Sequence, residues 1–132
     1  MPHRRLVDLA ILSCAVSAGI HAALVPEHFD EGIGPGTGFV FSAVLLAALA
    51  IGLTRRPSRL ALAASAAAFA ALLAAYALAV TTGLPVLHPE TETVDGLALF
   101  TKGVEAVGLA AALFALARPS ILVHSQPKGA RS

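Results

Sequence analysis

The sequence predicts an all-α integral membrane protein: a four-helix bundle with both termini in the cytoplasm and two acidic extracytoplasmic loops. Three observations predict this fold class. Of the 132 residues, 57% are hydrophobic and only 13% are charged, whereas a soluble domain has about 45–50% apolar and about 25% charged residues. The apolar residues fall into long blocks, and the basic and acidic residues occupy alternate connections between these blocks.

The apolar blocks cover roughly residues 6–25, 38–54, 60–82 and 96–117. Each block approaches the about 20 apolar residues that a helix needs to cross about 30 Å of hydrocarbon. Little of the chain lies outside them, so we expect a single transmembrane domain over residues 1–132. Residues 118–132 are expected to form a short cytoplasmic tail.

The charged residues predict the orientation of the chain. All but one of the nine Lys and Arg residues flank block one, separate blocks two and three, or follow block four: Arg4, Arg5, Arg55, Arg56, Arg59, Arg118, Lys128 and Arg131. The other two connections carry only acids: Glu27, Asp30, Glu31, Glu90, Glu92 and Asp95. Short loops rich in Lys and Arg stay in the cytoplasm. The pattern therefore predicts a multi-pass protein of the cell membrane with its acidic loops outside.

Block one has an alternative interpretation as a secretory signal peptide. Arg4 and Arg5 precede an apolar run, and small residues follow at positions 16–18. Asp8 interrupts this run early and the apolar stretch continues to Val25, which favours a retained membrane helix. Cys14 is the single cysteine, so an internal disulfide is excluded.

Proline, glycine and capping residues predict where the helices end. We expect Pro26 to end the first helix, because proline lacks an N–H and clashes with the preceding turn. The Gly- and Pro-rich residues 32–36 are expected to form a loop. Residues 81–85 should end the third helix, and Asp95 should cap the start of the fourth.

Small residues predict close packing between helices. Ala15, Gly19 and Ala23 recur at every fourth position of block one, and Gly108 and Ala112 do so in block four. Alanine dominates two adjacent faces of block three, which predicts packing on both sides of that helix. We therefore expect self-association or docking to a larger membrane complex.

Glu105 lies near the middle of block four, where an isolated charge costs at least about 2.5 kcal/mol. Lys102 lies three residues earlier on the same helix face, so the two are expected to form an intramembrane charged pair. Two interpretations follow. The pair is either structural, or Glu105 is a ligand-binding or proton-relay carboxylate.

A second group of polar residues predicts a metal site. A continuous helix would put His21, His28 and Glu31 roughly on one side, although Pro26 lies between the two histidines, and imidazole with carboxylate suits zinc, iron or copper. Glu105 is the expected fourth ligand. Other outer-face candidates are His88, Glu90 and Asp95. The alternative is that the acids only keep the outer face solvated.

Several signatures of other functions are missing from the sequence. It contains no Gly-rich phosphate loop, no Gly-x-Ser-x-Gly turn and no Cys-x-x-Cys pair. The basic residues form only short clusters beside the predicted helices, which argues against nucleic-acid binding. The abundance of Ala and Gly and the excess of Arg over Lys are typical of a GC-rich bacterial source.

The residues 20–24 (Ile-His-Ala-Ala-Leu), 26–31 (Pro-Glu-His-Phe-Asp-Glu) and 82–85 (Thr-Gly-Leu-Pro), with Asp95 and Glu105, resemble a group of small four-helix membrane proteins of actinobacteria. The resemblance covers most of the chain through short motifs. It implies the architecture, and the pairing of the outer His/Glu cluster with the acids of block four, but no activity.

Function is expected at the outer face. The first hypothesis is a non-enzymatic accessory or binding subunit whose acidic surface meets a partner or a cation. The second is a metal-binding protein or metalloenzyme using the His/Glu cluster. The third is a subunit of a proton- or cation-coupled transporter.

Overall fold

The structure, a computed structural model, describes residues 1–85 and 89–119, and this part of the chain contains four helices and no strands. They are α1 (His3–Glu31), α2 (Ile33–Arg55), α3 (Arg59–Thr81) and α4 (Gly96–Ala117). Each helix is long and apolar enough to cross a membrane. The predicted all-α architecture is therefore confirmed, and α4 has the predicted bounds.

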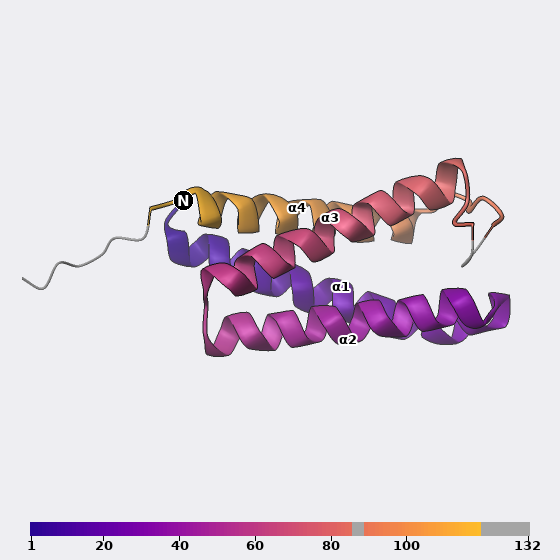
Figure 1. Cartoon of the computed structure of the whole chain (residues 1–132), viewed down its shortest axis with the longest axis horizontal. Helices are drawn as coiled ribbons and strands as arrows, with labels where there is room; N and C mark the ends of the chain where they lie inside the picture. The colour runs from indigo at the N-terminus through magenta and orange to yellow at the C-terminus, as the bar shows by residue number, and fades with distance from the viewer. Residues whose placement is uncertain (86–88, 120–132) are drawn as a thin grey trace, which may run out of the picture.

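Helix α1 organises the bundle (Figure 1). It packs most extensively against α2 and then against α4, while α3 packs mainly against α4 and touches α1 and α2 little. Successive helices run in opposite directions, so the chain has two distinct ends. Arg4, Arg55, Arg59 and Arg118 lie at one end, and the acidic residues of the two other connections lie at the opposite end. We call these the basic end and the acidic end.

The turn between α1 and α2 corrects the sequence prediction. The first helix does not end at Pro26 but runs through it to Glu31, and residues 33–36 belong to α2 rather than to a loop. Pro26 removes one backbone hydrogen bond, to the carbonyl four residues earlier, which other groups in a membrane bundle can offset. Pro35 falls in the first turn of α2, where an N–H has no partner within the helix. Only Gly32 separates the helices, with a φ of 157° that glycine adopts readily.

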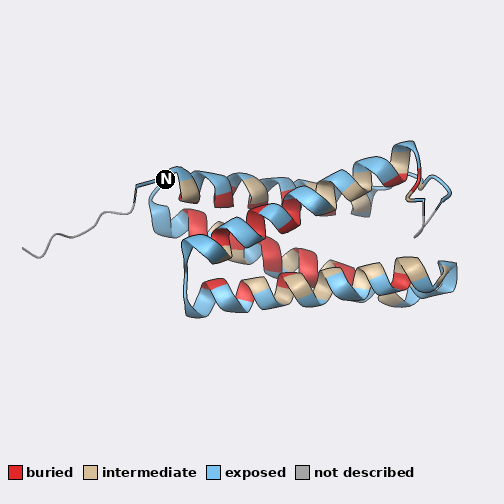
Figure 2. Ribbon diagram, viewed as in Figure 1, coloured by how far each residue is buried: buried red, intermediate tan, exposed pale blue. Residues whose placement is uncertain are grey.

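The half of the bundle toward the basic end is closed by a continuous apolar core. Its buried members come from all four helices: Leu6, Val7, Ala10, Leu53, Leu62, Ala66, Ala111, Ala112 and Ala115. A second cluster, which includes Cys14, Leu46 and Phe69, continues this core toward the middle. Figure 2 shows most of the buried positions in this part of the molecule.

Gly108 provides the close approach predicted for the last helix. A Cβ atom at this position would lie 2.5 Å from the Phe69 ring and 2.6 Å from Cβ of Ser13. Only glycine therefore lets α1, α3 and α4 meet here. Ala112, one turn further along α4, is fully buried.

The small-residue face predicted for α1 does not pack within the chain, and of the two alanine faces predicted for α3 only the one with Ala66 reaches the core. Ala15, Gly19 and Ala23 are exposed, and α1 instead turns Ser13, Ser17 and His21 inward. Polar side chains in a membrane helix are costly when they face hydrocarbon, so they determine which face is buried. Helix α3 likewise buries one face only and leaves residues 63, 67 and 71, all alanine, exposed.

Capping side chains fix the start of the last two helices. Ser58 accepts a hydrogen bond of 3.1 Å from the N–H of Ala61, and Asp95 accepts one of 2.7 Å from Ala98. The predicted cap at Asp95 is thus confirmed. The carboxylate also adds negative charge at the start of α4, where the helix dipole favours it.

Candidate functional site

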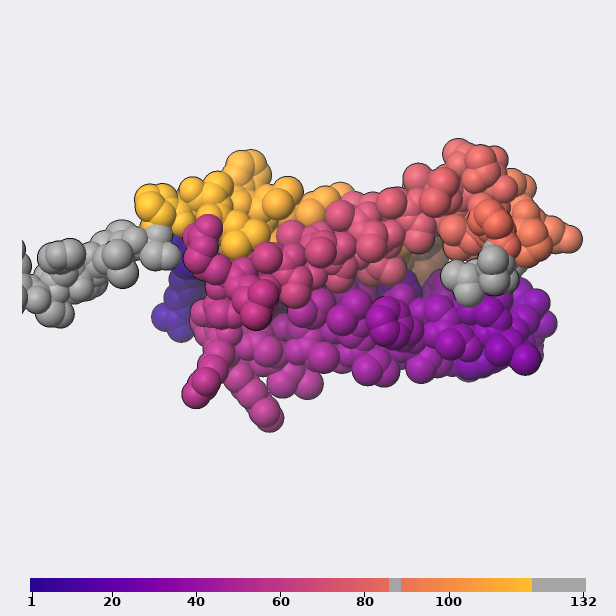
Figure 3. Space-filling view, viewed as in Figure 1, coloured from indigo at the N-terminus to yellow at the C-terminus, as the bar shows by residue number. Residues whose placement is uncertain are grey.

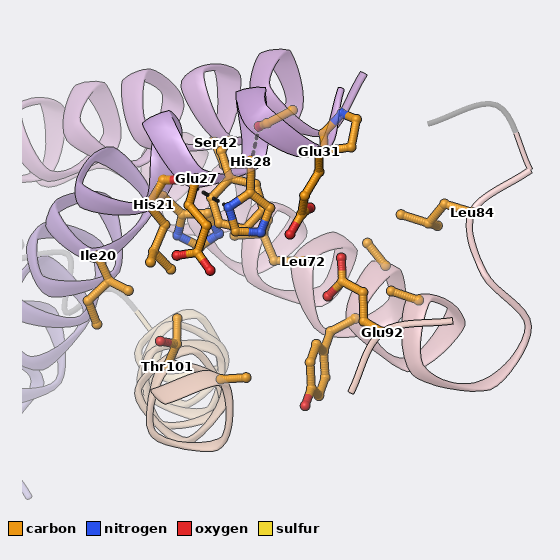
Figure 4. A pocket seen from close by; sticks show the side chains of 18 of the residues that line it. Ile20, His21, Glu27, His28, Glu31, Ser42, Leu72, Leu84, Glu92 and Thr101 are labelled. Atoms are coloured by element: carbon orange, nitrogen blue, oxygen red, sulfur yellow. Dashed lines mark hydrogen bonds between the residues drawn. The ribbon is translucent and has the colours of Figure 1, made fainter. Parts of the chain in front are cut away.

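The acidic end of the bundle contains a cavity of about 600 Å³, a size typical of ligand-binding pockets. It is bounded by all four helices and by the segment that joins α3 to α4. The cavity forms because α2 and α3 make few contacts with one another. Figure 3 shows the surface hollowed between these two helices, and Figure 4 shows the cavity from close by.

A fully buried carboxylate lies beside the inner part of this cavity. Glu105 is 0% exposed. One of its oxygens, Oε2, accepts a hydrogen bond of 2.6 Å from the Lys102 ammonium, and the other, Oε1, accepts one of 2.9 Å from the Ser17 hydroxyl. The predicted pair of Lys102 and Glu105 is therefore present, and Ser17 ties it to α1. Charge-assisted bonds of this kind are the usual way to bury a carboxylate.

His21 joins the same network from α1. Its Nδ1 lies 2.8 Å from the Ser17 carbonyl, which can only accept, so Nδ1 carries a proton. In the neutral imidazole the lone pair is then on Nε2, which lies 3.9 Å from Oε1 of Glu105. Both His21 and Lys102 line the cavity, and they connect it to the buried Glu105.

We call the group of Ser17, His21, Lys102 and Glu105 the inner network. The aromatic ring of Phe39 separates the inner network from the cavity mouth. Its centroid lies 5.1 Å from that of His21 and 3.5 Å from that of His28, with which it stacks. A second aromatic residue, Tyr76, lies beneath the ammonium of Lys102, whose Nζ is 5.4 Å from the ring centroid. The Tyr76 hydroxyl is buried without a hydrogen-bond partner among the described residues.

Three potential metal ligands meet at the mouth of the cavity. His28, Glu31 and Glu92 each offer one ligand atom, and these atoms all lie within 4.8 Å of one another. His28 and Glu31 come from the last turns of α1, and Glu92 comes from the segment before α4. We call these residues the outer trio. In Figure 4 the carboxylates of Glu31 and Glu92 point toward each other beside the His28 ring.

The structure divides the four residues predicted to bind metal between these two groups. His28 and Glu31 belong to the outer trio, whereas His21 and Glu105 lie together in the inner network. Asp95 lines the cavity and caps α4; Glu90 is exposed and does not line it. His88 lies outside the described residues.

Sequence reasoning missed Glu92 as a potential metal ligand, and it missed Phe39 and Tyr76 as residues that line the cavity. Glu92 was grouped only with the acids of its loop, because nothing in its spacing links it to α1. The sequence predicted a loop over residues 32–36, and such a loop does not indicate that Phe39 lies near His28. The tight hairpin at Gly32 brings the two residues together. Tyr76 is the single tyrosine, and no other feature of the sequence set this residue apart.

The cavity is closed at its inner end, because the apolar core fills the half of the bundle beyond the inner network. Such an arrangement can bind a ligand from the acidic end. Comparisons with protein-family models, with curated proteins and with solved structures returned no match for this chain, so its function has to be inferred from the cavity itself.

Proposed function

We propose that this chain is a non-enzymatic protein of the cell membrane that binds a cation in the cavity and acts as an accessory or binding subunit. One observation carries the proposal. Four carboxylates line a single cavity: Glu27, Glu31, Glu92 and Asp95. The lining also includes Lys102, whose charge Glu105 balances. A concave site lined by one sign of charge concentrates ions of the opposite sign.

The distribution of basic residues supports an extracytoplasmic position for the cavity. Under the positive-inside rule the basic end faces the cytoplasm. Both termini are then cytoplasmic, and both acidic connections are outside. A cation would reach the cavity from outside the cell or from the periplasm.

The closed apolar core favours binding over transport. A transported ion would have to pass through the buried core that contains Ala10, Ala111 and Ala112, which are 0–2% exposed. The transporter hypothesis therefore requires a different arrangement of the helices or an oligomer. The exposed alanine face of α3 supports docking to a second copy or to a larger membrane complex, because small residues let helices approach closely.

Calorimetric titration of the purified protein in mild detergent tests cation binding. The probes are the chlorides of Mg²⁺, Ca²⁺, Mn²⁺ and Zn²⁺, and tetramethylammonium chloride. We expect at least one of them to bind, and to bind at least tenfold more weakly when Glu27→Gln and Glu92→Gln are combined.

Asp30→Asn is the matched control, because Asp30 is exposed at the same end but does not line the cavity. It should leave the affinity within about twofold. Absence of binding by every probe would overturn the proposal, and so would equal losses in the double variant and the control.

A further inference from the structure

We infer that the bound cation is a divalent first-row transition-metal ion, held at the cavity mouth by the outer trio of His28, Glu31 and Glu92. This inference rests on the proposed cation binding and specifies its chemistry. Bonds of about 2.0–2.2 Å to imidazole nitrogen and carboxylate oxygen place two ligands at most about 4.4 Å apart. The trio atoms lie within 4.8 Å of one another, so small rotations of the two glutamate side chains complete the site.

The hydrogen bond of His28 selects the tautomer that suits metal binding through Nε2. Its Nδ1 lies 2.9 Å from the carbonyl of Leu24, which can only accept, so Nδ1 carries the proton. The lone pair of the neutral ring is then on Nε2. Histidines that bind metals usually donate their other N–H to such a carbonyl, which fixes both the tautomer and the ring orientation. Stacking with Phe39 at 3.5 Å holds the same ring from its face.

The backbone also positions Glu92. Its N–H donates a hydrogen bond of 3.0 Å to the carbonyl of Ala79 in the last turns of α3. This bond ties the segment before α4 to α3 and holds Glu92 beside the cavity. The outer trio therefore combines residues of the α1–α2 hairpin with one from the segment before α4, at the end where α2 and α3 diverge.

A buried polar atom deeper in the cavity indicates an additional bound group. The hydroxyl of Tyr76 is buried without a hydrogen-bond partner among the described residues. Buried polar atoms are normally paired with protein or with water. Three protein ligands leave at least one coordination position open, and water or a small ligand between the ion and the Tyr76 hydroxyl would occupy that position and pair with the hydroxyl.

The ligand set selects the class of metal. One imidazole and two carboxylates suit Zn²⁺, Fe²⁺, Co²⁺ and Mn²⁺, whereas Cu⁺ prefers thiolate or thioether sulfur. Mg²⁺ and Ca²⁺ prefer sites made of oxygen alone. Because divalent ions generally follow the Irving–Williams order, Zn²⁺ should bind more tightly than Mn²⁺.

Metal content by elemental mass spectrometry tests this site. The protein is purified without a histidine tag, incubated with Zn²⁺ and dialysed. We expect about one Zn²⁺ per wild-type chain, and an at least tenfold lower affinity in His28→Gln, Glu31→Gln and Glu92→Gln, because the loss of a residue that only supports a ligand already costs about 10–100-fold. Asp30→Asn is the control and should keep the ion, and His21→Gln is measured beside it to compare the inner network with the outer trio.

A spectroscopic measurement on the wild-type protein avoids dependence on the folding of variants. Pulsed electron paramagnetic resonance of the Mn²⁺-loaded protein should show coupling to the nitrogen of one directly bound imidazole. Coupling to two imidazoles, or to none, would overturn the assignment to the outer trio.

The results separate this inference from the proposed function. Binding of Ca²⁺, Mg²⁺ or tetramethylammonium that depends on Glu27, without binding of Zn²⁺ or Mn²⁺, would overturn the transition-metal site alone. Absence of binding by all five probes would overturn both. Loss of Zn²⁺ from His21→Gln to the same extent as from His28→Gln would place the ion in the inner network instead.

Discussion

The hydroxyl of Ser17 in α1 donates a hydrogen bond of 2.9 Å to Glu105 in α4, 88 positions along the chain. This bond and the one from Lys102 supply both oxygens of a carboxylate that is 0% exposed. The two helices are thus joined by a polar contact directly beside the cavity. The stability of the bundle and the geometry of its cavity are consequently coupled.

Replacing Ser17 by alanine should destabilise the bundle. The change leaves Oε1 of Glu105 without its hydroxyl donor, and hydrogen bonds between membrane helices contribute about 0.6–2 kcal/mol. Unfolding in mixed detergent and sodium dodecyl sulfate measures the effect. Ser42→Ala is the control, because the Ser42 hydroxyl bonds within its own helix, to the Gly38 carbonyl. Equal effects of the two changes would argue against a stabilising contact between α1 and α4.

Lys102 and Glu105 should behave as a coupled pair. Lys102→Met leaves a buried carboxylate without its cation, and breaking a buried pair on one side costs about 3–5 kcal/mol. Adding Glu105→Gln removes the unpaired charge. We therefore expect the double variant to be more stable than Lys102→Met alone in the same unfolding assay. A double variant that loses the sum of the two single effects would show that the residues do not interact.

Gly108 should not tolerate a side chain. Gly108→Ala places a methyl group against Phe69 and Ser13, and overpacking of this kind costs about 1–3 kcal/mol. Gly103→Ala is the matched control in the same helix, since nothing lies within 4 Å of its added Cβ. Thermal denaturation in detergent should show a lower midpoint for Gly108→Ala only. A control that is destabilised as much would contradict the close approach of α1, α3 and α4.

Metal binding should weaken on acidification. Imidazole and carboxylate ligands must be deprotonated to bind, so protons compete with the ion. Lowering the pH from about 7.5 to about 5.5 should reduce the affinity for Zn²⁺ at least tenfold, because metal binding to such ligands releases protons. Titrations at several pH values measure this dependence. An affinity that is constant over this range would exclude His28 as a ligand.

The orientation of the chain is testable with single cysteines. Cys14→Ser provides a cysteine-free background, and Glu90→Cys or Arg56→Cys then adds one thiol at either end. A membrane-impermeant maleimide applied to intact cells should label Glu90→Cys and spare Arg56→Cys until the membrane is permeabilised. The reverse pattern would place the cavity on the cytoplasmic side.

The sequence predicts this fold well where local signals act alone. Helix α4 has the predicted bounds because Asp95 caps its start and Pro119 follows its end. At Pro26 and Pro35 local preferences were misleading. Packing of Phe29 onto Gly36, where a Cβ would overlap the ring, stabilises a tight hairpin that proline and glycine signals alone do not predict.

The candidate site was predictable only within a helix. His28 and Glu31 lie three positions apart in α1, so their common face follows from helix geometry. The pairing of Ser17 and His21 with Glu105, and the position of Glu92 beside His28, depend on how α1 lies against the α3–α4 hairpin. Sequence periodicity determines the face of a helix but not its register against another.

The most direct test is the position of the ion itself. Crystals of the wild-type protein soaked in Zn²⁺ and measured at the zinc absorption edge would locate it by anomalous scattering. The account predicts one strong peak about 2.0–2.2 Å from Nε2 of His28 and from a carboxylate oxygen of Glu31 and of Glu92. A peak between His21 and Glu105, or no peak in the cavity, would contradict it.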